Sequence, residues 1–320
     1  MRLARVRALR ANPPGLAAGD ADRRDVFGAA LEQFEQLLRA AEVSGPASAP
    51  LPLFYALSQA GRAIAAARLN DPAEPERWNY IGHGLGGAKN YSSPIGSVPV
   101  RPAKGNTEAF QVVSEATGSS PLLANRPLEL GELWASLPLT QTGEGLGADL
   151  PRPITLREHI HPTWGALTCI EAPMGPDADV VSAVSDLLAL YPAANGHRQL
   201  SQALPRPGWV RAEIYWPDAQ PPGTVGPTSR PLREMFDSYW SDSTFYLRPA
   251  VGGQRAPSIL MTWWAVLFAL SHLARYAPAV WTAAISPDSS VLTVPIEDGL
   301  RSAKRGLPRL VYHGITGSWD

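Results

Sequence analysis

The stretch SILMTWWAVLFALSHLARYAP, Ser258–Pro278, decides the fold that this sequence predicts. From residue 259 to residue 270 only Thr262 is polar, so a helix formed here would be apolar on every side and would have to be buried. A helix that spans a membrane needs roughly 20 apolar residues, whereas this run ends at Ser271. We therefore predict the central buried helix of a soluble protein, capped by Ser258 and ended by Pro278.

The last two turns of this helix carry polar side chains. His272 and Arg275 are three residues apart and therefore lie next to each other on the helix surface. In one interpretation both are structural: Arg275 holds a neighbouring loop or helix end, and His272 donates to a carbonyl. In the other, the imidazole and the guanidinium form the floor of a site for a phosphate or a carboxylate.

The composition limits the classes of protein to consider. The chain has 320 residues, of which 45% are hydrophobic, and its net charge of −1 gives no general sign of nucleic-acid binding. Its single cysteine, Cys169, rules out an intramolecular disulfide and fits a reducing compartment. The N-terminal residues include Arg7 and Arg10 but no apolar signal segment, so we expect a first helix with solvated arginines. These features predict a cytoplasmic protein without a membrane segment.

Hydrophobic periodicity assigns elements along the rest of the chain. Helices are predicted over residues 22–41, 51–69, 128–137, 179–191, 231–240 and 295–304. Strands are predicted over residues 109–113, 165–171, 209–216, 244–247, 289–294 and 310–312.

The predicted fold class is α+β and mostly helical: a helix bundle with a loop-rich, strand-containing middle section. The short loop between the helices at 22–41 and 51–69 predicts an antiparallel helix hairpin. No clear linker interrupts the chain, so we expect one integrated domain over residues 1–320. Its parts are a helical section at 20–90, a mixed strand and loop section at 91–250, and the core helix with the C-terminal segment at 251–320.

A glycine-rich turn at residues 82–87, GHGLGG, matches the spacing GxGxxG. A dinucleotide site needs a strand before this motif and a helix after it. Here a helix precedes the motif and the residues SSPIGS follow it, so we do not predict such a site. A turn with exposed glycine amides can still hold an anion. His83 and Gly84, together with His272 and Arg275, therefore form the predicted ligand-binding set.

His159 and His161, with Glu158 beside them, are the residues most like metal ligands. On a strand the two imidazoles would lie on one face and could share a metal ion. Pro162 interrupts the pattern and no third ligand lies nearby, so we favour a loop pair and predict no metal and no cofactor. The P-loop, the GxSxG elbow, HExxH and CxxC are absent from the sequence.

Arg77 and His83 stand in the arrangement R-x5-H after the predicted helix pair. An arginine stabilises the charge of a phosphorane, and a histidine moves a proton near neutral pH. These two groups are the minimum for metal-free RNA cleavage, in which the 2′-hydroxyl attacks its own phosphate. The spacing by itself is a weak signal, because arginine and histidine fall at such separations by chance.

Four stretches of the chain resemble the YaaC-like family of bacterial proteins. They are LPLFYALSQAGRAI at 51–64, the step His83-Gly84, FALSHLARYAPAVW at 268–281 and LPRLVYHGI at 307–315. Within the third, LARY-x-P-x-x-W is the most specific part. The stretches span most of the chain in the order expected for the family, and the middle section carries no part of the resemblance. The resemblance implies no particular activity.

The first half also resembles, more distantly, the helical HEPN group. There a helix with a Tyr-Ala and an Arg-Ala step, here Tyr55-Ala56 and Arg62-Ala63, precedes a polar motif R-x4-6-H. The resemblance implies a metal-independent ribonuclease in which Arg77 binds phosphate and His83 is the acid and base, in a site composed by a homodimer. The glycines that follow His83 depart from that motif, which usually lies on a helix.

Two hypotheses of function follow. The first is a non-catalytic or regulatory binding protein, in a bacterial stress or antiphage setting, for an anionic ligand, RNA or a protein partner. The second is the HEPN-like ribonuclease, with His83 and Arg77 as its catalytic residues. We favour the first, because motif spacing without the proper helix is weak support for catalysis. Both require that the end of the central helix lies close to the glycine turn.

Overall fold

The computed structural model of the chain describes residues 2–80, 82–87, 91, 94–103, 108–123, 126–139, 145–156, 166–175, 178–194, 199–216, 219–220, 230–231, 237–238 and 245–318. These form two compact units. The first comprises Met1–Ala135, Leu139–Leu150 and Pro257–Asp320, and the second comprises Ser136–Pro138 and Pro151–Ala256. The expectation of one integrated domain stays a prediction, because this division does not decide whether the units fold together.

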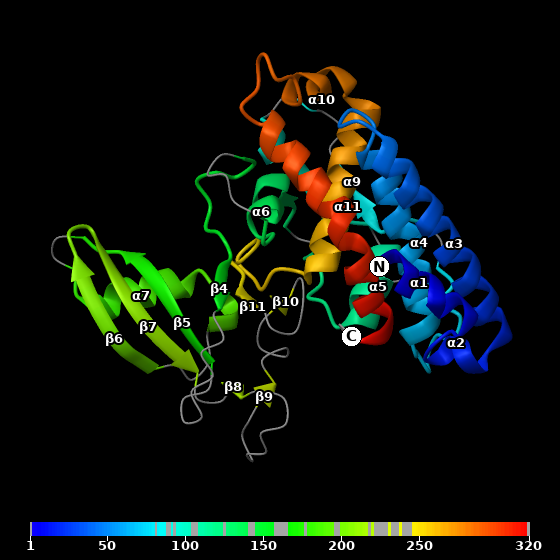
Figure 1. Ribbon diagram of the computed structural model, residues 1–320, viewed down its shortest axis with the longest axis horizontal. Coiled ribbons are helices and arrows are strands. Elements are labelled where there is room, and N and C mark those ends of the chain that lie inside the picture. The colour runs from blue at the N-terminus through cyan, green and yellow to red at the C-terminus, as the bar shows by residue number, and fades with distance from the viewer. Residues whose placement is uncertain are drawn as a thin grey trace. The chain divides into compact units, whose positions relative to one another are not determined.

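The first unit is built mainly of helices (Figure 1). They are α1 (Arg2–Ala11), α2 (Leu16–Gly19), α3 (Ala21–Val43), α4 (Pro50–Arg68), α5 (Ala109–Thr117), α6 (Leu130–Ala135), α9 (Ile259–Tyr276), α10 (Pro278–Ala284) and α11 (Thr293–Thr316). A 3-10 turn, η1 (Ile95–Ser97), and the short strands β1 (Leu85–Gly86), β2 (Pro99–Pro102) and β3 (Leu128–Glu129) complete the unit. The strands pair antiparallel in the order β1-β2-β3.

Helix α9 is the centre of this unit, as its sequence predicts. It packs against α4, α6, α10 and α11, and Figure 1 shows it beside α4 and α11. The side chain of Ser258 accepts from the backbone N–H of Met261 and caps the helix, while Pro278 begins α10. Among the described residues it is the one helix long and apolar enough to cross a membrane, yet 78% of that window is buried inside the protein.

The other parts of the first unit bear out some predictions and correct others. Helices α3 and α4 pack against each other as the predicted hairpin. The N-terminal arginines are not simply solvated, because Arg7 forms an ion pair with Glu35 and Arg10 with Glu32. The buried carboxylate of Glu35 therefore fastens α1 to α3.

Three of the predicted strand regions are helical or lead into a helix. Residues 109–113 begin α5, where Phe110, Val112 and Val113 are buried. Residues 289–294 form a turn and the first residues of α11, which then continues through 310–312. Short apolar runs suit a strand and a buried helix equally well, and these runs were therefore predicted as strands. The burial of Leu307, Pro308 and Val311 on one side of α11 outweighs that signal.

The second unit contains most of the strands. They are β4 (Ile154–Leu156), β5 (Ala166–Pro173), β6 (Gln199–Arg206), β7 (Trp209–Trp216), β8 (Ala219–Gln220), β9 (Arg230–Pro231), β10 (Asp237–Ser238) and β11 (Phe245–Leu247). The sheets are antiparallel in the orders β5-β7-β6 and β10-β11-β4, and β8 and β9 form a parallel pair. Of the helix predicted at 231–240, residues 231, 237 and 238 lie in strands, and the others lie outside the described residues.

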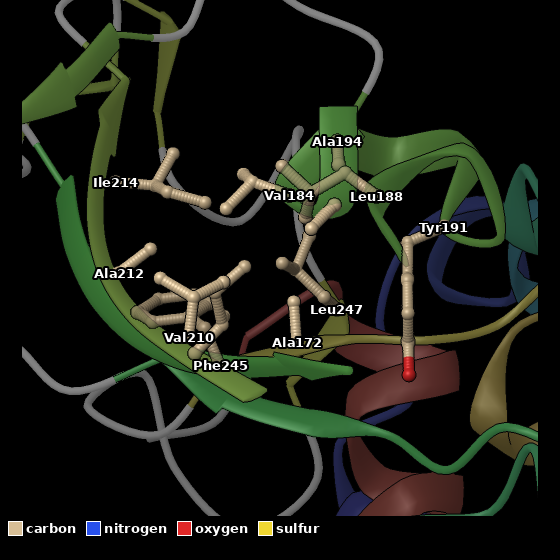
Figure 2. Packing of buried hydrophobic residues seen from close by; sticks show 12 residues of the cluster. Ala172, Val184, Leu188, Tyr191, Ala194, Val210, Ala212, Ile214, Phe245 and Leu247 are labelled. Atoms are coloured by element: carbon tan, nitrogen blue, oxygen red, sulfur yellow. The ribbon is translucent and has the colours of Figure 1, made fainter. Parts of the chain in front are cut away.

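Helix α7 (Val180–Ala189) covers one face of the β5-β7-β6 sheet, and the 3-10 turn η2 (Pro192–Ala194) follows it. Figure 2 shows Val184 and Leu188 of α7 facing Val210, Ala212 and Ile214 of β7. On β7 the buried residues alternate with more exposed ones, as a strand with one covered face requires. The fold is thus α+β and mostly helical, which confirms the predicted class.

The close approach of α4 and α9 gives a test of the fold. A Cβ atom at Gly61 would overlap the ring of Trp264, whereas one at Gly28 of α3 would meet nothing within 4 Å. Gly61→Ala should lower the free energy of unfolding by about 1–3 kcal/mol, the typical cost of overpacking. Gly28→Ala should raise it by about 0.5–1 kcal/mol, because alanine is the better helix former. Urea unfolding of both variants measures the difference, and equal stability of the two would contradict the described contact.

Candidate functional site

His83 lies in the glycine-rich turn that follows α4, in the first unit. One side of its ring is exposed to solvent. The other side rests on two aromatic residues of α4, with ring centroids 5.6 Å from Phe54 and 6.1 Å from Tyr55. Helix α4 is apolar over most of its length, and Tyr55, Gln59 and Arg62 recur on it at intervals of four and three residues. This polar stripe is where α4 meets the glycine turn.

Arg275, near the end of α9, reaches the same place. Its Nε donates to the carbonyl of Ser271 at 3.2 Å, and its Nη1 donates to the hydroxyl of Tyr55 at 3.2 Å. The guanidinium also lies 5.9 Å from the ring centroid of Tyr55 and 5.1 Å from that of Tyr276. The end of the central helix is thus brought to the α4 residues that support His83, as the sequence predicted.

Arg62 of α4 is the second arginine whose charge acts on His83. We call the surface formed by Tyr55, Arg62, His83, His272 and Arg275 the candidate face. Its Nη1 donates to the carbonyl of Tyr80 at 3.1 Å, and its guanidinium lies 5.1 Å from the Tyr80 ring centroid. Among the residues that the structure describes, neither Arg62 nor Arg275 forms an ion pair with a carboxylate. Carbonyls, a hydroxyl and aromatic faces orient both guanidiniums but leave their charges uncompensated.

These charges act on the protonation of His83. Burial against the aromatic residues lowers the pKa of His83 below its ordinary 6.5, and the positive charges of Arg275 and Arg62 lower it further. The carboxylate of Glu108 opposes them and raises the pKa in part. The imidazole of His83 is therefore mainly neutral at pH 7, and an anion bound beside it would favour its protonated form.

His272 is the second histidine of the face. Its Nδ1 is hydrogen-bonded to the hydroxyl of Tyr91, and its ring centroid lies 4.5 Å from that of Tyr276. A Cβ atom at Gly87 would lie 3.2 Å from the ring, so His272 packs directly on the glycine turn. Burial, and then the charge of Arg275, lower its pKa. The hydrogen bond to Tyr91 replaces the bond to a carbonyl that the structural interpretation assumed.

The glycine turn itself is occupied by an internal anion. The N–H of Gly84 donates to Oε2 of Glu108 at 3.3 Å, and a side chain at Gly82 would overlap that carboxylate. Both glycines have positive φ angles, 96° for Gly82 and 75° for Gly84, which other residues rarely adopt. The amide of Gly84, a predicted ligand-binding group, thus already has an acceptor within the protein.

The structure does not bring Arg77 to His83. The guanidinium of Arg77 forms ion pairs with Asp71 at 2.7 Å and with Glu115 of α5 at 2.5 Å. These hydrogen bonds raise its pKa, the one to Glu115 contributing most. Arg77 is not among the described charges that shift the pKa of His83. Its contacts fasten the segment after α4 to α5.

His159 and His161 are the residues that we compared with metal ligands and interpreted as a loop pair without a metal. His159 and His161 lie outside the described residues. The described part of the chain contains no group of three or more histidine, cysteine, aspartate or glutamate side chains that could hold a metal ion.

Three contributors to the face were missed at the level of sequence: Tyr55, Arg62 and Glu108. The first two interrupt an otherwise apolar helix at a spacing of seven residues, which was the available signal. Glu108 gives no local signal, because it lies 24 residues from Gly84 and meets it only in the folded chain.

A known protein family matches the chain over most of its length. The model described as YaaC-like Protein matches residues 14–315, nearly the whole chain. The chain belongs to the YaaC-like family. No curated protein and no solved structure matches it. The match covers α4, the glycine turn and α9, so every residue of the candidate face in this YaaC-like protein lies within the family region, while the HEPN resemblance stays a hypothesis.

The electrostatics of the face can be tested by titration. Arg275→Gln removes a positive charge that acts on both histidines, so the pKa values of His83 and His272 should both rise. Arg77→Gln should leave them unchanged, because its charge is taken up by Asp71 and Glu115. NMR titration of the histidine ring protons measures the pKa values. A shift of His83 in the Arg77 variant would place Arg77 at the site after all.

Proposed function

We propose that this YaaC-like protein is a binding protein for a phosphate-bearing ligand, which it holds through His83, Arg275 and Arg62. One observation carries the proposal. Two guanidiniums without a carboxylate partner in the described part of the chain both act electrostatically on one exposed histidine. Uncompensated positive charge on a half-buried face is costly for the free protein, and a bound anion relieves that cost.

The chemistry of the arginines favours phosphate. A guanidinium presents a planar fork of donors that matches two oxygens of a phosphate. The contacts with Ser271 and Tyr55 use only part of the donors of Arg275. His83 can add a charged hydrogen bond once the ligand raises its pKa.

The aromatic residues favour a ligand that also carries a base. Tyr276 is 63% exposed, lies beside His272 and has the guanidinium of Arg275 over its ring. Aromatic side chains next to cations are the usual surface on which nucleobases stack. A nucleotide or a short single-stranded RNA therefore suits the face better than an inorganic ion. The regulatory role, the protein partner, the bacterial stress or antiphage setting and the cytoplasmic location are parts of the same proposal and rest on the resemblance and the composition.

Binding can be measured by calorimetry with two probes, inorganic pyrophosphate and a single-stranded RNA hexamer. Arg275→Gln and Arg62→Gln should each weaken binding about tenfold or more, because a hydrogen bond to a charged group contributes roughly 1.5–3 kcal/mol. RNA that binds more tightly than pyrophosphate would identify the base-bearing ligand. If pyrophosphate binds as tightly as the RNA, the phosphate groups alone account for the binding.

The control is Arg301→Gln, which removes the same charge from an exposed arginine of α11 that is paired with Asp298. It should bind as the wild type does, and equal loss in all three variants would show only a general effect of charge. The affinity should also rise as the pH falls below 7, because binding raises the pKa of His83 and takes up a proton. That dependence should weaken in His83→Gln.

The second candidate is the metal-independent ribonuclease. An exposed, mainly neutral histidine on which two guanidiniums act electrostatically has the groups that the reaction requires, a proton acceptor and cations for the phosphorane charge. Because Arg77 is held by Asp71 and Glu115, the cationic role would fall to Arg275 or Arg62 in this candidate. A site composed by a homodimer belongs to this candidate as well.

RNA cleavage in EDTA separates the two candidates. If the protein only binds, neither the wild type nor His83→Ala should cleave the RNA hexamer. Cleavage by the wild type that is lost in His83→Ala and in Arg275→Gln would replace the binding proposal with catalysis. Equal cleavage by wild type and His83→Ala would point to a contaminating nuclease.

A further inference from the structure

The second unit contains a pocket that the site around His83 does not use. Its volume is about 470 Å³, and its lining includes Arg152, Ile154, Glu171, Leu187, Tyr191 and Arg211. These residues come from the segment that leads into β4, from β5 and β7, and from α7 and the residues after it. The pocket lies entirely within the second unit.

Arg152 is the unusual member of the lining. Burial lowers its pKa, and no carboxylate in the described part of the chain opposes that effect. Within the described ranges of the chain, its guanidinium has no hydrogen bond and no ion pair. The backbone of the residue is nevertheless held, because the hydroxyl of Tyr191 donates to the carbonyl of Arg152 at 2.7 Å. A positioned, partly buried cation without a counter-ion is a place where an anion binds with little reorganisation.

The other two charged residues of the described lining are opposite in sign. Glu171 of β5 and Arg211 of β7 are directly opposite in the antiparallel register, which places their side chains next to each other on one face of the sheet. Tyr191 adds no negative charge, since burial raises its pKa to about 12. The described lining therefore retains one positive charge, that of Arg152.

The other residues in the described part of the lining are apolar. Ile154, Ile170 and Leu187 belong to the pocket together with Pro153. Ile170 is also part of the hydrophobic cluster drawn in Figure 2, and Ile154 and Leu187 pack against that cluster. The apolar wall is thus fixed by the core of the unit. A ligand that fits must combine one negative charge with an apolar body.

We propose that this pocket binds a small organic anion whose carboxylate or phosphate group pairs with Arg152 and whose apolar body lies against Ile154, Ile170 and Leu187. The site is separate from the face around His83, and its ligand class differs in requiring an apolar body. An arginine binds carboxylate and phosphate in the same bidentate way, so the structure assigns the charge and the shape of the ligand.

Calorimetry with the full chain tests the proposal with 4-methylpentanoate, its neutral amide 4-methylpentanamide, acetate and 3-methylbutyl phosphate as probes. The branched carboxylate should bind. The amide should bind at least tenfold more weakly because it lacks the charge, and acetate should also bind at least tenfold more weakly because it lacks the apolar body. The relative affinity of the phosphate monoester decides between the two anion types. Binding of neither branched anion, or equal binding of the amide, would overturn the proposal without any variant.

Substitutions then locate the site. Arg152→Gln should weaken binding of the branched anion at least tenfold, and Arg152→Lys should restore part of it. Arg206→Gln removes an exposed arginine at the end of β6, outside the pocket lining, and should leave binding unchanged. Arg275→Gln should also leave it unchanged, which separates this site from the one around His83. Unchanged binding in an Arg152→Gln protein with wild-type circular dichroism would show that the anion binds elsewhere.

Discussion

The contact of the Trp264 ring with Gly61 is the constraint on which the first unit depends. Only a residue without a side chain lets α4 and α9 approach so closely, and a Cβ atom at that position would lie within the indole. The two helices carry the parts of the candidate face: Tyr55 and Arg62 come from α4, and Arg275 comes from α9. The distance between the helices therefore sets the distance between the charges.

This packing leaves two buried hydrogen-bond donors without acceptors among the described residues. The indole nitrogens of Trp263 and Trp264 are buried, and neither has a partner among the described residues. A buried donor without an acceptor costs about 1–3 kcal/mol. Burial of a large aromatic side chain contributes a similar or larger amount, and edge-to-face contacts with Trp134 and Phe110 add to it. The shape of the indoles, rather than their polarity, explains their presence in the core.

The sequence predicted those elements whose local signals agree. Helix α9 has a capping serine, an unbroken apolar run and a terminal proline, and its observed bounds follow these signals closely. Helix α5 was predicted as a strand, and α11 was predicted only over residues 295–304 with a strand on each side, because the local signals there conflict. Val112 and Val113 favour a strand locally, and Pro308 favours a helix end, yet in both places burial against the rest of the unit decides the structure. Local preference is worth a few tenths of a kcal/mol per residue, and buried side chains outweigh it.

The same reasoning explains which parts of the face could be predicted. His272 and Arg275 end an apolar helix, so the helix alone predicted that they would need polar partners, whereas their approach to the glycine turn was an assumption of both hypotheses. Glu108 could not be foreseen, yet it fixes the balance of charge, since its carboxylate lies in the turn where an external anion was expected. A single exchange of this carboxylate for an amide would keep the acceptor for Gly84 and give up the negative charge. Position 108 is therefore where the charge of the face can change by one unit while the hydrogen bond that holds the glycine turn is kept.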